Sequence, residues 1–341
     1  MFRKTVVVVM MMIAFTACTQ GPKEDLIQTT YAIGTVININ LYDQGDQDLM
    51  NDLIARVSEI EGMMSSQKST SEVSEVTRQA GIAPVKVSPE TYKVVKRALY
   101  YASLSNGSFD PTIGPIVKLW GIGTEEARVP DEGEIEEALK LVDYTKVRID
   151  DTEQTVFLEN VGMSLDLGGI AKGYVADELV VMLDEAQVER AMINLGGNIY
   201  AYGEKAEGEA YKIAIQTPYD NRNTYFGYVS LKNKTVVTSG PYERYFEEDG
   251  QIYHHIFNAN TGYPVQSDVA SVSIIAEQSM DGDALATLLF TMSPEEGLAL
   301  IGSIEGVECI YVDKSFNLRV TDGLTTSFTL TDDTYKLSQD N

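Results

Sequence analysis

Two side chains near the end of the sequence, Asp283 and Thr287, have the types and the spacing of a site for a hard cation. A helix brings residues four apart to one face, so the two would lie one turn apart. Carboxylate and hydroxyl oxygens are ligands that Mg²⁺ takes. Two other interpretations stay open. Asp283 would fit as an ordinary first-turn carboxylate facing the helix dipole, and Thr287 as a side chain bonded back to its own helix.

A glycine pair and a lysine, Gly168, Gly169 and Lys172, have the composition of a phosphate cradle. Glycines let a backbone approach a ligand closely, a helix N-terminus offers free N–H groups, and Lys172 adds a positive charge. A tight strand-to-helix turn would explain the same residues. Neither the dinucleotide pattern G-x-G-x-x-G nor a P-loop is present, so the segment supports neither of those two cofactor sites.

Other polar and turn-forming segments could line a cleft. Asp110, in the turn-rich segment 109–115, would accept hydrogen bonds from a ligand or cap a turn with its own side chain. The glycine-bearing segments 194–198 and 238–242 fit plain hairpin turns equally well. His254 and His255 are adjacent in an expected strand and would point to opposite faces, which disfavours a zinc site or catalytic dyad built on both.

The charge of the chain limits what it binds. The 341 residues include 26 basic and 51 acidic ones, for a net charge of −25. Such a surface repels nucleic acid and anionic lipid. A polyanionic ligand would therefore need a local positive group or a bridging cation, which the segments around Lys172 and Asp283 could supply. Cys309 lies in an apolar strand-like run and is expected to be buried rather than reactive.

The N-terminus has the pattern of an export signal. Arg3 and Lys4 precede an apolar run, 6–15, that is too short to span a bilayer. The run ends just before Cys18 and resembles a bacterial lipoprotein signal, with a plain secretory signal as the alternative. We therefore expect a lipid-anchored protein on the extracytoplasmic face of a bacterial cell membrane. The expected divisions are a signal peptide (1–17), the lipidated Cys18 with a tether (18–29), and one catalytic domain (30–335).

The periodicity of the sequence mixes helices and strands without a strict alternation. Helices are expected at 48–64, from the cap Ser88 to the Asn106-Gly107 pair, and at 134–141, 170–183, 283–292 and 293–301. Strands are expected at 31–41, 155–158, 163–167, 191–194, 199–202, 211–215, 225–231, 234–238, 242–246, 252–257 and 269–276, and a loop at 65–77. This mixture favours an α+β fold, a two-lobed single body of mixed, mostly antiparallel sheets with packed helices.

Taken together, several of these segments resemble one family, the FAD:protein FMN transferases (ApbE-type flavin transferases). The matching segments are 109–123, 164–177 (SLDLGGIAKGYVAD), 192–203, 238–246, 255–265 and 283–288. They occur in the order of the family and are spread over residues 109–288, more than half of the mature chain. Several motifs in order are more specific than any one alone.

The resemblance implies a reaction and a site. Family members move the FMN half of FAD to a threonine hydroxyl of a partner flavoprotein and release AMP. It implies that Mg²⁺ is held by Asp283, Thr287 and the backbone carbonyl of Gly169, with Asp283 also catalytic. Asp281 is placed outside that ligand set. The positions implied to contact FAD are Ile33, Glu72, Val73, Ser74, Asp110, Lys172 and Phe257.

The chain departs from the family pattern at two positions. Ile33 stands before Gly34-Thr35 where the family usually has methionine, and Thr77 stands where it usually has an asparagine near the nucleotide. Two alternatives to transfer also stay open. One is hydrolysis of FAD to FMN and AMP at the same site, and the other is a non-catalytic lipoprotein that binds FAD.

Overall fold

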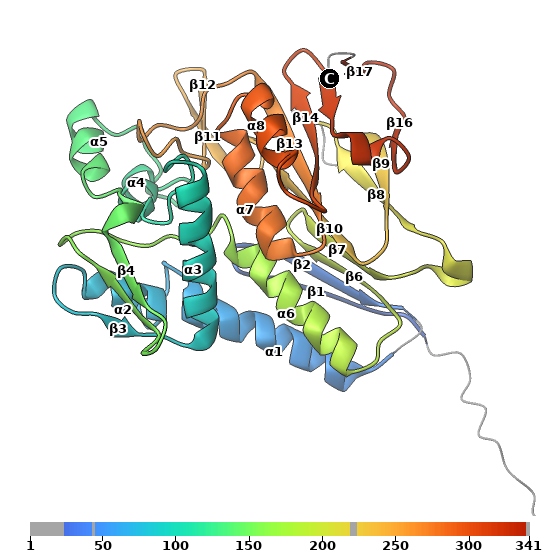
Figure 1. Cartoon of the computed structure of the whole chain (residues 1–341), viewed down its shortest axis with the longest axis horizontal. Coiled ribbons are helices and arrows are strands. Elements are labelled where there is room, and N and C mark those ends of the chain that lie inside the picture. The colour runs from blue at the N-terminus through green and yellow to red at the C-terminus, as the bar shows by residue number, and fades with distance from the viewer. Residues whose placement is uncertain (1–23, 43–44, 219–223, 339–341) are drawn as a thin grey trace, which may run out of the picture.

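The protein is built on one large sheet, seen in a computed structural model that describes residues 24–42, 45–218 and 224–338 (Figure 1). Nine strands form the sheet, in the order β1-β2-β6-β7-β10-β13-β14-β15-β17, and all neighbours are antiparallel except β15 and β17. Their bounds are β1 (Leu26–Ala32), β2 (Thr35–Leu41), β6 (Arg190–Leu195), β7 (Asn198–Gly203), β10 (Lys234–Ser239), β13 (Val269–Ala276), β14 (Glu308–Asp313), β15 (Asn317–Val320) and β17 (Lys336–Leu337).

Both faces of this sheet are covered. The helices α1 (Gln47–Met64), α6 (Ala171–Glu185), α7 (Ser279–Phe290) and α8 (Pro294–Ile301) lie on one face (Figure 1). A three-stranded sheet of β8 (Tyr211–Gln216), β9 (Tyr225–Leu231) and β16 (Phe328–Leu330) packs on the other. Side chains alternate across a strand, so Ile274 of β13 enters the first core and Ile275 the second. This is why every residue of β13 is buried, including Ser271 and Ser273.

A smaller lobe lies beside the helical face (Figure 1). Its elements are α2 (Glu72–Arg78), β3 (Val85–Lys86), α3 (Pro89–Leu104), α4 (Gly114–Trp120), α5 (Glu132–Leu139), the 3-10 turn η1 (Tyr144–Lys146), β4 (Val147–Asp150) and β5 (Thr155–Leu158). A hairpin of β11 (Tyr245–Glu248) and β12 (Gln251–His254) and two further 3-10 turns, η2 (Ala206–Gly208) and η3 (Asp322–Leu324), complete the fold. Val73, Val94 and Leu158 of the lobe belong to the main core, so the lobes form one body. The expected α+β fold is confirmed.

Several predicted segments differ from the structure. The expected loop at 65–77 contains α2, because Ser71 caps that helix and Val73 and Val76 bury its apolar face. The expected strand at 163–167 is absent from the described sheets. That segment lies instead along the loop after α3, where Asp166 N–H donates to Pro111 O at 2.8 Å.

The expected single strand at 31–41 is a hairpin. Ile33 and Gly34 have φ angles of 48° and 71°, so both central residues of the two-residue turn are left-handed. A β-branched residue rarely adopts such a φ. The N–H of Ile33 donates to Glu61 Oε1 at 2.8 Å, a contact that holds the turn against α1.

The two ends of the folded body extend beyond the predicted domain boundaries. β1 begins at Leu26, so the expected tether end at residue 29 falls inside a strand paired with β2, and β17 begins at Lys336, after the expected domain end at residue 335. The predicted signal peptide and Cys18 lie outside the described residues. Within the described ranges, no helix is long and apolar enough to cross a membrane.

Candidate active site

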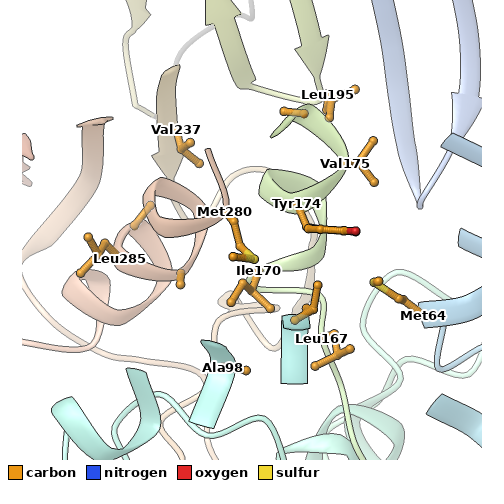
Figure 2. Close-up of a cluster of buried hydrophobic side chains, with 14 of the residues drawn as sticks. Met64, Ala98, Leu167, Ile170, Tyr174, Val175, Leu195, Val237, Met280 and Leu285 are labelled. Atoms are coloured by element: carbon orange, nitrogen blue, oxygen red, sulfur yellow. The ribbon is translucent and has the colours of Figure 1, made fainter. Parts of the chain in front are cut away.

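The start of α6 packs against α7 and brings together residues that the sequence separates by more than a hundred positions. Lys172 Nζ lies 3.0 Å from Asp283 Oδ1. A Cβ built on Gly169 would lie 3.2 Å from Thr287 Oγ1, so these two residues are also neighbours. Figure 2 shows the apolar side chains packed around this junction, among them Ile170 from the start of α6 and Met280 from α7. The structure therefore groups Gly169, Lys172, Asp283 and Thr287.

The close approach of the two helices depends on Gly173. A Cβ at this position would lie 2.2 Å from the carbonyl oxygen of Ser279, which no side chain could tolerate without a shift. Glycine in a helix costs about 0.5–1 kcal/mol relative to alanine. Here it lets the two backbones touch, and its N–H donates to Asp283 Oδ2 at 3.0 Å.

Asp283 is a buried carboxylate with two partners. Only 2% of the residue is exposed, and its oxygens contact Lys172 and the N–H of Gly173. The sequence suggested that Asp283 lies in the first turn of its helix. Because α7 begins at Ser279, Asp283 lies in the second turn instead. Its carboxylate therefore faces the N-terminus of α6 rather than that of its own helix. Burial with charged and N–H partners is what an ionised carboxylate requires.

Thr287 is not bonded back to α7. Among the described residues its hydroxyl has no hydrogen-bond partner, whereas Thr291 near the end of the same helix does bond back, to Leu288 O at 2.7 Å. The oxygen of Thr287 is thus available beside Gly169.

The donor set fits a hard cation. One carboxylate, one free hydroxyl and one backbone carbonyl are all oxygen ligands, as Mg²⁺ prefers. In the described ranges, no three Asp, Glu, His or Cys side chains lie close enough together to hold a metal ion by themselves. Any cation at this site would accordingly take its other ligands from water or from the phosphates of a substrate.

Asp281 has a separate partner. Its Oδ1 and Oδ2 accept hydrogen bonds from Nε and Nη2 of Arg97 in α3, both at 2.7 Å. This two-point pair ties the start of α7 to the smaller lobe and leaves Asp281 unavailable to the site, in line with its exclusion from the expected ligand set.

His255 lies within electrostatic reach of Lys172, and it was not among the site residues expected from the sequence. Its ring Nδ1 lies 3.2 Å from Arg244 O. A carbonyl only accepts, so Nδ1 carries the proton and Nε2 keeps a lone pair. Partial desolvation of the ring, with the positive charges of Arg244 and Lys172, holds the pKa of His255 below its usual range. The imidazole is therefore a neutral proton acceptor near Lys172.

The neighbouring His254 has a structural role. It is buried, its Nε2 contacts Val265 O at 2.9 Å, and its ring packs edge-on against Phe290. Adjacent histidines in a strand point to opposite faces, which disfavours a shared site but leaves a role for either one alone. The available signal was that one matched motif, 255–265, begins at His255.

Arg244 brings a second cation to the same region. A Cβ on Gly34 would lie 3.8 Å from its Nη1, and one on Gly123 would lie 3.5 Å from its Cδ. Arg244 therefore lies between the Ile33-Gly34 turn and the loop after α4. With Lys172 it forms a local positive region on a chain of net charge −25. Gly196 lies in the turn that connects β6 and β7, and this turn packs against Thr35 of the β1–β2 hairpin.

Several positions expected to contact FAD have protein partners in the structure. The carboxylate of Glu72 accepts from the N–H and hydroxyl of Ser88, at 2.9 and 2.7 Å. The side chain of Val73 is fully buried, and Ser74 N–H donates to the cap Ser71. Contact between these residues and FAD stays a prediction.

Asp110 and Phe257 are likewise built into the protein. Asp110 Oδ1 accepts from the N–H and hydroxyl of Thr112, both at 2.7 Å, and Oδ2 accepts from Tyr144 N–H at 2.9 Å. Burial raises the pKa of this carboxyl. The turn-capping alternative is therefore the arrangement observed. Phe257 packs 6.0 Å from Trp120 in the small core of the lobe, and its role toward FAD also stays a prediction.

A comparison with known families matches this arrangement. The sequence profile of the ApbE family matches residues 33–311, which include every residue of the junction. This chain belongs to the ApbE family. Its membership covers both lobes, so the junction of α6 and α7 is part of the family's shared fold.

The similar proteins with assigned names are flavin transferases. The chain is 37% identical over 283 residues to an FAD:protein FMN transferase of Klebsiella pneumoniae, with 83% of this chain and 87% of that one covered. It is 36% identical over 309 residues to one of Treponema pallidum, at 86% and 85% coverage.

Solved structures agree in fold. The ApbE protein of Thermotoga maritima superposes with a TM-score of 0.80 at 32% identity, over 88% of this chain and 97% of that one. The flavin transferase ApbE of Vibrio cholerae gives a TM-score of 0.77 at 28% identity, over 92% and 99%.

Proposed function

We propose that this protein transfers the FMN moiety of FAD to a threonine hydroxyl of a partner flavoprotein, with Mg²⁺, and releases AMP. The observation that carries the proposal is the grouping of Gly169, Lys172, Asp283 and Thr287 at one helix junction, in a chain whose relatives are named FAD:protein FMN transferases. A pyrophosphate substrate needs local positive charge on this acidic chain, and the junction has it.

Each residue of the junction has its own role in the proposed phosphoryl transfer. Gly169 O, Asp283 and Thr287 would hold Mg²⁺, which when bound neutralises phosphate charge and the charge that develops during transfer. Lys172, at the N-terminus of α6, would bind the pyrophosphate oxygens. The threonine oxygen forms a bond to the FMN phosphorus, the bond from phosphorus to the AMP oxygen breaks, and Nε2 of His255 accepts the hydroxyl proton.

The test is a transfer assay with the mature protein, FAD, Mg²⁺ and a flavoprotein domain that carries a target threonine. We expect covalent, fluorescent flavin on that domain and an equal amount of AMP, both lost with a chelator. The control is the same domain with its threonine replaced by valine. FMN and AMP without labelled domain would establish hydrolysis instead, and intact FAD would establish binding alone.

We also propose that Cys18 is lipidated and anchors the protein to the extracytoplasmic face of a bacterial membrane, where its flavoprotein partner would be found. The basis is the charged start and short apolar run before Cys18. Full-length protein expressed in a bacterial host with radiolabelled palmitate should incorporate the label, and a Cys18→Ser variant should not. Label on both, or on neither, would exclude acylation at Cys18.

A further inference from the structure

Helices α6 and α7 cap each other. Asp177 of α6 accepts the N–H of Ser279 at Oδ1 (2.6 Å) and that of Met280 at Oδ2 (2.8 Å), which are the first two residues of α7. In return, Asp283 of α7 accepts the N–H of Gly173 in the first turn of α6, at 3.0 Å. Each helix thus supplies the carboxylate that satisfies free N–H groups of the other.

Neither helix has a cap of its own. In the described chain, the residues that precede α6 and α7, Ile170 and Gln278, make no side-chain hydrogen bond to their helices. A capping carboxylate typically stabilises a helix end, and the negative charge suits the helix dipole there. The exchange of carboxylates therefore replaces two ordinary caps.

The two contacts determine the axial register of the helices. Gly173 and Asp177 are four residues apart on α6, and Ser279 and Asp283 are four apart on α7, so each pair shares one face. Gly173 and Ser279 touch backbone to backbone between the two contacts. A slide of one helix along the other would break both carboxylate contacts together.

The rest of α7 is anchored independently of Asp177. The hydroxyl of Ser279 donates to Asn198 Oδ1 at 2.8 Å, and Arg97 holds Asp281. The charged groups that act on the carboxyl of Asp177 are Asp281 and Lys93 of α3. Loss of Asp177 should therefore leave α7 folded and in place on the sheet while loosening its fit against α6.

We propose that Asp177 is a positioning residue of the transfer reaction, because by capping α7 it sets the place of Asp283 against Gly173, Lys172 and Gly169. It touches none of the reacting groups itself. The metal part of this inference rests on the proposed role of Asp283 as a Mg²⁺ ligand. A residue that orients a ligand in this way typically changes metal affinity by about 10- to 100-fold.

The test compares Asp177→Asn, which keeps one carbonyl acceptor, and Asp177→Ala, which keeps none. The matched control is Asp184→Asn, on the same helix, where the carboxylate instead accepts the hydroxyl of Tyr202 at 2.5 Å. Two properties are measured in each purified protein. They are the affinity for Mn²⁺ as a stand-in for Mg²⁺, followed by electron paramagnetic resonance, and the hydrogen exchange of the peptide around Gly173.

We expect Mn²⁺ affinity to fall about 10-fold in Asp177→Asn and further in Asp177→Ala, with faster exchange at Gly173 and a near-normal rate of transfer at saturating Mg²⁺. Asp184→Asn should change neither property. Wild-type affinity and exchange in both Asp177 variants would overturn the proposal. If the wild-type protein binds no Mn²⁺, the proposed metal role fails, while the exchange measurement still decides whether Asp177 positions the junction.

Discussion

Lys172 and Asp283 form an ion pair at 3.0 Å between Nζ and Oδ1, although 111 positions separate them in the sequence. The pair gives the buried carboxylate a charged partner when no other cation is present. A cation bound at Asp283 would share that oxygen with Lys172 or displace it. The same ammonium group would then be free to approach a phosphate, so the two residues act as one unit.

Replacing Asp283 with asparagine should remove most of the transfer activity. The change deletes the only carboxylate of the proposed ligand set, and we expect the rate to fall by at least about 100-fold at saturating Mg²⁺. Transfer of flavin to an acceptor domain measures it, with Asp184→Asn as the control. Undiminished transfer in Asp283→Asn would remove its proposed role as metal ligand.

Replacing Lys172 with methionine should have opposite effects on two ligands. The KM for FAD should rise by about 10-fold, because a charge-assisted contact to phosphate is lost. Affinity for Mn²⁺ without FAD should rise several-fold, because the competing ammonium group beside Asp283 is gone. Electron paramagnetic resonance and steady-state kinetics give the two values. A fall in Mn²⁺ affinity would show that Lys172 supports the cation site instead of competing for it.

The lowered pKa of His255 predicts the pH dependence of transfer. An ordinary histidine titrates near pH 6.5, so a catalytic base of that kind would lose activity between about pH 8 and 6. The pKa of His255 is held lower by partial desolvation and by Arg244 and Lys172, so we expect little loss in that range. The pH profile of transfer measures this.

The role of His255 itself is tested by substitution. His255→Gln should lower the rate about 100-fold or more, whereas the control His254→Gln changes only structural contacts, to Val265 O, Ile256 N–H and the ring of Phe290. Equal rates in the two variants would exclude His255 as the proton acceptor.

Asp177 predicts a pH dependence of stability. Burial raises its pKa to about 6, although the N–H groups of Met280 and Ser279 and the charge of Lys93 act in the other direction. A carboxyl with a raised folded-state pKa contributes stability below its unfolded value, near 3.9, and loses it as pH rises through the folded value. The free energy of unfolding, measured with urea, should therefore fall more in the wild type than in Asp177→Asn as the pH rises from 4 to 7. Parallel curves would contradict the raised pKa.

Gly173→Ala should destabilise the protein even though alanine favours helices. The added Cβ would lie 2.2 Å from Ser279 O, and such overpacking costs about 1–3 kcal/mol. The matched control is Gly133→Ala in α5, where a Cβ meets nothing within 4 Å and helix propensity predicts a gain of up to about 1 kcal/mol. Denaturant unfolding measures both changes. A stable Gly173→Ala with normal transfer would show that the helix approach is not tightly constrained.

Local chemistry was enough to predict much of the fold. Ser88 and Pro89 begin α3 as expected of a cap and a first-turn proline, and the β-branched run at β10 and the mostly apolar run at β13 are strands. These features depend on neighbours within a few residues. The α+β class follows from their mixture, without knowledge of which elements touch.

Local chemistry failed where a distant partner decides the conformation. The strand-like residues 163–167 lie along the loop that contains Pro111, and the polar residues 65–77 become helical where Val73 and Val76 reach the core. From the sequence, the carboxylate of Asp110 could bind a ligand or cap a turn. In the structure its oxygens accept hydrogen bonds from the N–H groups of Thr112 and Tyr144. In each case the competing contact comes from outside the local pattern.

The residue types of the site were readable from the sequence alone, because oxygen ligands, glycines and a lysine have recognisable chemistry. The family resemblance connected Gly169 and Lys172 with Asp283 and Thr287. Only the tertiary structure decided that α6 and α7 cap each other through Asp177 and Asp283, and that the charge of Lys172 acts on His255 and not on His254. The physical reason is that such contacts depend on how helices pack on the sheet, over separations that no local periodicity records.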